Sequence, residues 1–365
     1  MRKRLFFIFA GCLIASALMS QPHNTDMRVL SYYLGSPEAL DNFDATQMTH
    51  IIFCFGRLNG NRFFIRSARD TLVIQKMMSL KNQNPNLKVL ISLGGWGGCE
   101  TCSDVFASKA GTKEFVKSIE ETYDYFKVDG LDLDWEYPAI AGYQGHKFVP
   151  EDKKNFTRLV NELRKLGYDK ELSFAAGASQ RYIDSSIQWK QVMKKVDYVN
   201  LMTYDMSGPG SRTAMHHTNL FSSPEQPRSA DWMVKSLIEL GVPAKKIVVG
   251  GAFYGKIFEN ADNVNNGLGQ PATFKNTFIY RDMPTLFPAD SGWIYHWDEA
   301  AHAPYLYNAE KKQFVTYDDK KSIAEKAKYV IDNNLGGIMY WQLGGDDFNN
   351  GLLNEIDKVK KTYRP

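Results

Sequence analysis

Short runs of apolar, β-branched and aromatic residues recur along the chain and alternate with longer amphipathic stretches. Eight of these runs have the length and composition of buried strands. They span Val29–Tyr33, His50–Phe55, Lys88–Leu93, Gly130–Trp135, Leu172–Ala178, Tyr198–Thr203, Lys246–Ala252 and Gly337–Gln342. Because strands that alternate with helices pair in parallel, eight such units predict an α/β fold of the closed (β/α)8 TIM-barrel type.

Helical periodicity is clearest over residues 115–126 and 156–166, where apolar side chains repeat along one face. The segment Ser322–Glu325 has the pattern of a capping box, which predicts that the last crossover helix begins there with Ser322 as its N-cap. These stretches supply the helices that parallel strands need between them.

The spacing between the seventh and eighth predicted strands is unusual. Their first residues lie about 90 positions apart, whereas the other strands begin about 20 to 50 residues apart. The excess falls in roughly residues 256–316, which are rich in Asn, Tyr, Phe and short strand-like runs. Because a long connection in a compact fold usually has structure of its own, we predict a small α+β insertion that forms one wall of a cleft.

The run Asp129–Pro138 carries four acidic residues inside a predicted buried strand. Carboxylates are rarely buried unless they are paired. Strand side chains alternate between two faces, so Asp132, Asp134 and Glu136 share one face, and the leucines and the tryptophan between them share the other. In a closed barrel this pattern predicts an acidic inner row and an apolar outer row.

Three carboxylates in such a row cannot all be ionised comfortably, so at least one is expected to hold a proton near neutral pH and to serve as a general acid. An unperturbed Glu has a pKa of about 4.3, and raising it by about two units makes the acid form substantial. The alternatives are an exposed acidic loop and a calcium or magnesium site. The strand-like alternation disfavours a loop wrapped around a cation.

Composition narrows the function classes further. The chain has 365 residues, 44% of them hydrophobic and 23% charged, with a net charge of only +3, so nothing points to nucleic acid or to an anionic membrane. Residues 2–4 are basic, residues 5–19 are apolar, and Ala15-Ser16-Ala17 fits a cleavage site. This predicts a signal peptide over 1–20 and a secreted chain over 21–365, extracellular or periplasmic, although Cys12 leaves a lipoprotein signal open.

Three cysteines follow the predicted signal. Cys99 and Cys102 could close a small loop disulfide in an exported chain, whereas Cys54 lies within a strand and is expected to be a buried thiol. A lone CxxC has too few ligands for zinc, so we expect no metal.

Other residues with possible chemistry fall where predicted strands end. They are Ser92, Gly94, Gly95, Trp96, Tyr137, Met202, Tyr204, Asp205, Tyr254 and Trp341. Each has a structural interpretation as well, such as a tight turn, a core aromatic residue or a helix cap. In a TIM barrel the carboxyl ends of the strands form the active-site face, so together they favour an active site.

Several of these residues also form family motifs. The pattern Asp129-x-x-Asp132-x-Asp134-x-Glu136 resembles the long signature of glycoside hydrolase family 18, the chitinase family. Further matches are Ser92-x-Gly94-Gly95, Met202-x-Tyr204-Asp205, Trp341 and the insertion before the last strand. The resemblance covers essentially the whole mature chain.

The resemblance implies a retaining mechanism in which the N-acetyl group of the substrate is the nucleophile. Glu136 would be the general acid and Asp134 would orient the acetamide. Asp132 would share a proton with Asp134, Asp129 would support the acidic stack, and Tyr204 would bond the acetamide oxygen. Trp341 would form the floor beneath the sugar. The substrate-binding residues would be Asp129, Ser92, Gly94, Gly95, Trp96, Tyr137, Met202, Asp205, Tyr254, Trp341 and Tyr32.

The implied substrate is chitin or a chitooligosaccharide, and the resemblance implies no cofactor. We expect the chain to have no membrane span and to be a monomer. An endo-β-N-acetylglucosaminidase acting on N-glycans and a non-catalytic chitin-binding lectin are the alternatives. Trp96, Tyr137, Trp293 and Trp297 are candidates for further subsites. One departure from the family is Lys256, where relatives often carry an Arg with its planar fork.

Overall fold

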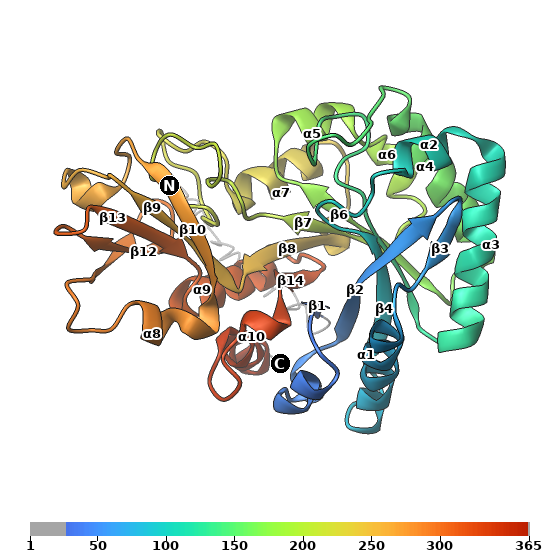
Figure 1. Ribbon diagram of the computed structural model, residues 1–365, viewed down its shortest axis with the longest axis horizontal. Helices are drawn as coiled ribbons and strands as arrows, with labels where there is room; N and C mark the ends of the chain where they lie inside the picture. Colours follow the sequence, from blue (N-terminus) through green and yellow to red (C-terminus); the bar gives the residue numbers. More distant parts are fainter. Residues whose placement is uncertain (1–26, 364–365) are drawn as a thin grey trace, which may run out of the picture.

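The computed structural model describes residues 27–363. Eight parallel strands form a closed barrel (Figure 1) because β1 pairs with both β2 and β14. They are β1 (Arg28–Tyr33), β2 (His50–Asn59), β4 (Lys88–Gly94), β5 (Gly130–Asp134), β6 (Glu171–Gly177), β7 (Tyr198–Met202), β8 (Ile247–Ala252) and β14 (Gly337–Trp341). The predicted TIM barrel is confirmed strand by strand. Only β2 runs clearly beyond its predicted end, where it forms a hairpin with β3 (Arg62–Phe64).

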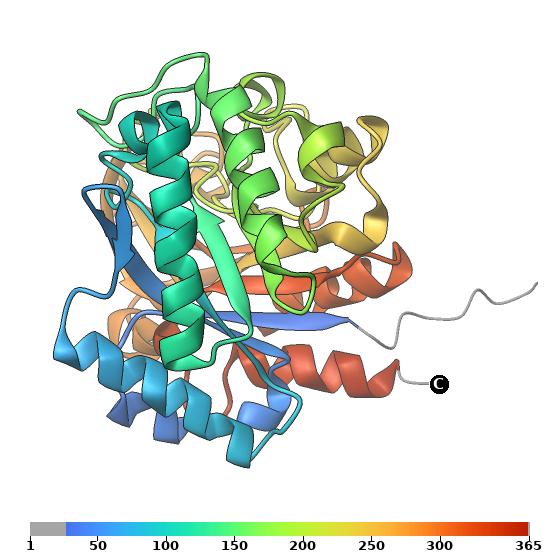
Figure 2. The same ribbon diagram turned by 90° about the vertical axis from the view of Figure 1, so that its right-hand side faces the viewer.

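Helices cover the outside of the barrel. The longer ones are α1 (Ala68–Ser79), α3 (Lys109–Phe126), α4 (Asp152–Leu163), α7 (Ala230–Glu239), α9 (Lys320–Asp332) and α10 (Leu352–Thr362). Figure 2 shows α3 and α4 lying side by side against the strands. Shorter helices are α2 (Cys102–Ala107), α5 (Gln180–Ser185) and α6 (Trp189–Val192). The two predicted apolar stripes are the buried faces of α3 and α4.

The predicted start of the last crossover helix is wrong by one turn. Helix α9 begins at Lys320, and its N-cap is Asp319, whose side chain accepts from Ser322 N at 2.8 Å. The Ser322 hydroxyl in turn accepts from Asp319 N at 3.0 Å, so Ser322 is the third helical residue of the capping box. A carboxylate at the N-cap is also stabilised by the positive end of the helix dipole.

The predicted insertion is a five-stranded antiparallel sheet between β8 and α9. Its spatial order is β10-β9-β13-β12-β11, and Figure 1 shows it beside the barrel. The elements are β9 (Tyr254–Glu259), β10 (Thr273–Ile279), α8 (Met283–Leu286), β11 (Ile294–Asp298), β12 (Ala303–Asn308) and β13 (Gln313–Tyr317). Strand β9 starts two residues after β8 ends, so the barrel strand leads almost directly into the inserted sheet.

Alternation on β5 separates two environments. Leu131, Leu133 and Trp135 point outward and are almost fully buried in the main core beneath the helices. A smaller apolar core fills the barrel itself, contributed by residues such as Leu90, Val248 and Met339. The inward-facing acidic residues of β5 therefore meet the barrel interior while their neighbours anchor the strand to the helical layer.

Three findings bear on the predictions about compartment. Cys99 and Cys102 form a disulfide, and Cys54 is a buried free thiol. Within residues 27–363, no helix is long and apolar enough to cross a membrane. The predicted signal peptide over 1–20 lies outside the described residues.

We predict that Leu133→Ala lowers the free energy of unfolding by about 2–5 kcal/mol, because it leaves a cavity between β5 and the helices. Chemical denaturation followed by circular dichroism measures this change. The matched control is Leu72→Ala on α1, whose side chain is 54% exposed and should change stability by less than about 0.5 kcal/mol. Equal effects of the two substitutions would contradict the assignment of Leu133 to the outer core.

Candidate active site

The acidic row of β5 lies inside the barrel at its carboxyl end. Asp132 is completely buried, and Asp134 and Glu136 are 5% and 9% exposed. Strand register places Ser92 beside Asp132 and Gly94 beside Asp134. The row thus becomes slightly more accessible toward the mouth, where Glu136 lies.

Asp132 at the base of the row has both carboxylate oxygens occupied. Its Oδ2 accepts from Ser92 Oγ at 2.8 Å and from the Tyr32 hydroxyl at 3.0 Å. Its Oδ1 accepts from Ser173 Oγ at 2.6 Å and from the Asn200 side-chain amide at 3.2 Å. Burial raises the pKa of Asp132, and these four donors oppose that rise. Four donors aimed at two oxygens fit an ionised carboxylate.

Two predictions about this region need correction. Ser92 and Tyr32 were expected to bind substrate, but both are nearly inaccessible and instead hold Asp132. Asp132 makes its four hydrogen bonds to other residues, and the proton that it was expected to share with Asp134 stays a prediction.

Asp129 is also misplaced by the prediction. It lies at the opposite end of β5, where its carboxylate accepts from Val89 N and pairs with Lys81, each at 2.7 Å. The structure therefore does not bring Asp129 to the acidic stack. Its contacts join the starts of β4 and β5, which is a structural role.

Asp134 is the group in the row whose partners are incomplete. Its Oδ1 is buried and has no hydrogen-bond partner. Burial, and then the negative charges of Glu136 and Asp132, raise the pKa of Asp134 well above its usual range. Gly94 and Gly95, both with positive φ, let the turn after β4 pass close to the backbone of Asp134. A Cβ on Gly94 would lie 2.2 Å from the Asp134 carbonyl oxygen. A buried acceptor without a donor indicates a place for an N–H or O–H from a ligand.

Glu136 lies at the mouth of the row. Burial, with a smaller contribution from the charge of Asp205, raises its pKa to about 7, and a hydrogen bond with Tyr137 opposes this. Glu136 also lines a cavity of about 230 Å³ together with Tyr137, Met202, Tyr204 and Asp205. A carboxyl group that exchanges its proton near neutral pH at the edge of a cavity can act as a general acid and base.

Aromatic rings surround the inner end of this site. The Trp341 indole stacks on Phe55 at 5.6 Å with an interplanar angle of 17° and lies 6.1 Å from the Tyr32 ring. Tyr204 packs against the same inner core, with its hydroxyl 3.9 Å from the Met339 sulfur. Trp341 is half-buried, so part of the indole is accessible for an apolar sugar face.

Asp205 lies at the edge of the cavity and, with its partners Tyr254 and Lys256, forms a charged cluster, the Asp205 corner. Asp205 Oδ1 accepts from the Tyr254 hydroxyl and from Lys256 Nζ, each at 2.5 Å. Asp205 has a φ of 56° and a side chain that is 57% exposed, while Lys256 is almost fully buried. Lys256 thus makes an ion pair with Asp205 through its single side-chain nitrogen.

The remaining predicted aromatic residues are spread over a wider surface. Trp96 is 60% exposed and lies 6.5 Å from Tyr137 and 5.6 Å from Tyr143, at the edge of the same face. Trp293 and Trp297 belong to the inserted domain. Trp297 borders a separate cavity of about 560 Å³, and Lys321 Nζ lies over its ring, 3.6 Å from the ring centroid. The structure does not bring these two tryptophans to the lining of the Glu136 cavity.

Sequence reasoning missed several residues that shape the site. Ser173, Asn200 and Phe55 lie on strands that were predicted correctly, and their inward positions could have been found from strand alternation. His217 lies in the loop after β7, and its place near Asp205 depends on a contact with Thr316, which is distant in sequence. Among residues 27–363, no group of three or more His, Cys, Asp or Glu side chains is arranged to hold a metal ion.

Comparison with known proteins identifies relatives of this chain. A family model described as "Glycosyl hydrolases family 18" matches residues 28–346. Chitinase A1 of Niallia circulans is 33% identical over 308 residues, covering 78% of this chain and 44% of that protein. Probable chitinase 2 of Drosophila melanogaster is 32% identical, covering 85% of this chain and 68% of that protein. The chain therefore spans less than half the length of the Niallia circulans relative.

Solved structures show the same architecture. A glycoside hydrolase family 18 N-acetylglucosaminidase from Paenibacillus barengoltzii has a TM-score of 0.83 and 32% identity, covering 91% of this chain and 99% of that chain. The Group IV chitinase of Ostrinia furnacalis in complex with allosamidin has a TM-score of 0.85 and 26% identity, covering 93% of this chain and all of that one.

The raised pKa of Glu136 predicts a pH-dependent cost to stability. Because its folded pKa of about 7 lies above the model value of 4.5, the folded state binds more protons between these values, and stability falls as pH rises through this window. Glu136→Gln should therefore be as stable as the original chain near pH 4.5 and more stable by about 1–3 kcal/mol near pH 8.

Chemical denaturation across this pH range measures the difference. The matched control is Glu239→Gln on the exposed end of α7, which should show no such growing advantage. A constant difference between Glu136→Gln and the original chain at every pH would contradict the raised pKa.

Proposed function

The chain belongs to glycosyl hydrolase family 18, and on this premise we propose that it is a secreted chitinase. Its substrate would be β-1,4-linked N-acetylglucosamine polymers or oligomers, cleaved with retention of anomeric configuration. The observation that carries the proposal is the buried Oδ1 of Asp134, which lacks a donor beside a carboxyl group of raised pKa. The acetamide N–H of an N-acetylated sugar is a donor that this acceptor would match.

In the first step, Asp134 accepts the acetamide N–H and turns the acetamide carbonyl oxygen toward the anomeric carbon. That oxygen forms the new bond to carbon while the glycosidic bond breaks, which gives an oxazolinium ion. The carboxylate of Asp134 then lies beside the positive charge of this ion. Burial strengthens the electrostatic stabilisation because little water screens it.

Glu136 supplies the proton that the leaving oxygen needs. Its pKa of about 7 means that the acid form is substantial near neutral pH. After the leaving sugar departs, the Glu136 carboxylate takes a proton from water, which attacks the anomeric carbon from the same side. The oxazolinium ring opens, the acetamide is regenerated, and the configuration is retained.

Substrate binding would use the aromatic floor and the Asp205 corner. The half-buried Trp341 indole offers an apolar surface to the C–H groups of the bound sugar. The Tyr204 hydroxyl, which donates to the weak acceptor sulfur of Met339 at 3.9 Å, would turn to the acetamide oxygen. Asp205 and Met202 line the same cavity and would contact the sugar edges. The signal-like N-terminus supports delivery of the enzyme outside the cytoplasm.

Two other functions remain as rivals. A chitin-binding lectin on this fold would lack a proton donor at position 136, whereas this chain carries Glu136 with a shifted pKa. An endo-β-N-acetylglucosaminidase would use the same machinery on N-glycans, and release of glycans from a high-mannose glycoprotein with chitin oligomers left intact would favour it.

We predict that Glu136→Gln lowers kcat for chitotetraose hydrolysis by about 10²–10⁴-fold, because the amide cannot donate a proton at the required acidity. Product quantification by mass spectrometry measures the rate. The Glu239→Gln control keeps the original rate because its side chain is exposed at the end of α7. A Glu136→Gln enzyme with the original kcat would rule out this residue as the acid.

We also predict that cellotetraose, which has the same β-1,4 linkage without acetamide groups, is cleaved at least about 10³-fold more slowly than chitotetraose. The reason is that the substrate itself supplies the nucleophile. The two sugars are compared at equal concentration with the same product assay. Comparable rates on both would contradict substrate assistance.

A further inference from the structure

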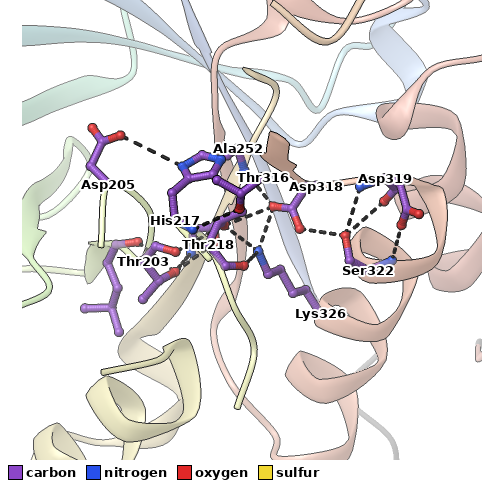
Figure 3. Close-up of polar contacts among 12 residues, drawn as sticks. Thr203, Asp205, His217, Thr218, Ala252, Thr316, Asp318, Asp319, Ser322 and Lys326 are labelled. Atoms are coloured by element: carbon purple, nitrogen blue, oxygen red, sulfur yellow. Dashed lines mark hydrogen bonds and ion pairs between the residues drawn. The ribbon is translucent and has the colours of Figure 1, made fainter. Parts of the chain in front are cut away.

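A buried ion pair lies directly behind the Asp205 corner of the cleft. Lys326 of α9 and Asp318, which follows β13, are both fully buried, with Nζ and Oδ2 2.6 Å apart (Figure 3). Lys326 Nζ also donates to the Thr218 carbonyl and hydroxyl oxygens, each at 2.6 Å. Asp318 Oδ2 accepts from Ala252 N at 3.0 Å, and its Oδ1 accepts from Ser322 Oγ at 2.7 Å. The pair thus joins the end of β8, the loop after β7, the exit of the inserted domain and α9.

Thr218, the loop residue that accepts both hydrogen bonds from Lys326, is the neighbour of His217 in the sequence. His217 is completely buried, and neither ring nitrogen has a hydrogen-bond partner. Its backbone is fixed on both sides, because its N–H donates to Thr316 Oγ1 at 3.0 Å and its carbonyl accepts from Met206 N at 3.1 Å. Its ring lies 5.0 Å from the Tyr254 ring, and Nδ1 is 4.0 Å from Asp205 Oδ1, as Figure 3 shows for the latter contact.

The charges around His217 balance only while it is neutral. Lys326 pairs with Asp318, and Lys256 pairs with Asp205, so two cations meet two carboxylates. A proton on His217 would place an uncompensated positive charge on a completely buried ring, which is costly. Burial, then the charges of Lys256 and Lys326, lower the pKa of His217 well below its usual range.

Two further groups face His217. The neighbouring His216 adds to the lowering of its pKa and bonds Asp298 through Nε2 at 3.0 Å. The Tyr254 backbone acts in the opposite direction and raises the pKa of His217. The phenol of Tyr254 is itself committed to Asp205 at 2.5 Å.

We propose that the Lys326–Asp318 ion pair is a positioning element of the cleft, which keeps His217 an uncharged support behind Asp205. Lys326 touches no substrate in this scheme. It acts through Thr218 and His217 on the carboxylate that lines the Glu136 cavity. The kinetic consequence rests on the proposed function, whereas the charge state of His217 does not.

Loss of Lys326 has a defined electrostatic result. The cation that opposes protonation of His217 is removed, and Asp318 is left as an unpaired buried carboxylate that favours it. The pKa of His217 therefore rises, and the imidazolium that forms as pH falls competes with Lys256 and Tyr254 for Asp205. Asp205 is then drawn away from the cavity, so substrate binding weakens on the acidic side of the pH profile.

The test compares Lys326→Gln with the double variant Lys326→Gln/Asp318→Asn, which restores the charge balance. Histidine NMR from about pH 5 to 8 follows the ring proton of His217, assigned by its absence in His217→Asn. We expect His217 not to titrate in the original chain, to titrate in Lys326→Gln, and not to titrate in the double variant. On a fluorogenic chitobioside, kcat/KM of Lys326→Gln should fall about tenfold more than that of the original chain between pH 8 and pH 5, chiefly through KM.

The matched control is Lys328→Gln, which removes a half-exposed lysine from the same helix and should leave both readouts unchanged. The proposal is overturned if His217 titrates in the original chain, if folded Lys326→Gln behaves like the original chain, or if Lys328→Gln has an equal effect. If Lys326→Gln does not fold, Lys326→Met removes the same charge with a side chain of similar length, and a folded Lys326→Met in which His217 does not titrate overturns the proposal. An original chain inactive on chitobioside would sink the proposed function and leave the NMR result to judge the ion pair.

Discussion

The burial of three carboxyl groups along one face of β5 is the constraint on which the rest of the structure depends. Such a row is costly unless each member is satisfied, neutralised or reserved for a ligand. Asp132 is satisfied by four donors from four different strands, which makes it a rigid base. Burial, and then the charges of Glu136 and Asp132, raise the pKa of Asp134, whereas burial is the main cause of the raised pKa of Glu136. The chemistry arises from what the barrel leaves unsatisfied.

The same logic extends behind the cleft. The inserted sheet is connected to the barrel between β8 and α9. Where the chain leaves this sheet, the buried Lys326–Asp318 ion pair bonds it to the end of β8, the loop after β7 and α9. A buried pair of this kind adds little net stability compared with apolar packing, but losing one partner is costly, so it is well suited to specify one arrangement. The Asp205 corner combines the loop after β7 with β9, so its position depends on that arrangement.

Most of the fold could be predicted from the sequence because strand alternation and helical periodicity reflect burial directly. The acidic inner row followed from the same rule, and applying it consistently would have excluded Asp129, which has the parity of the outward leucines. Ser173 and Asn200 were missed although they are polar residues on buried strands. The contacts of Lys256, His217 and Lys326 could not be predicted, since they join segments up to 108 residues apart through loops without a periodic pattern.

The central claim is that Glu136 donates the proton while the acetamide of the substrate, held by Asp134, is the nucleophile. The most direct measurement is the anomeric configuration of the sugar released first from chitotetraose, followed by proton NMR before mutarotation. Two displacements at one carbon retain configuration, so the account predicts the β-anomer. Initial release of the α-anomer would mean direct attack by water and would contradict the account.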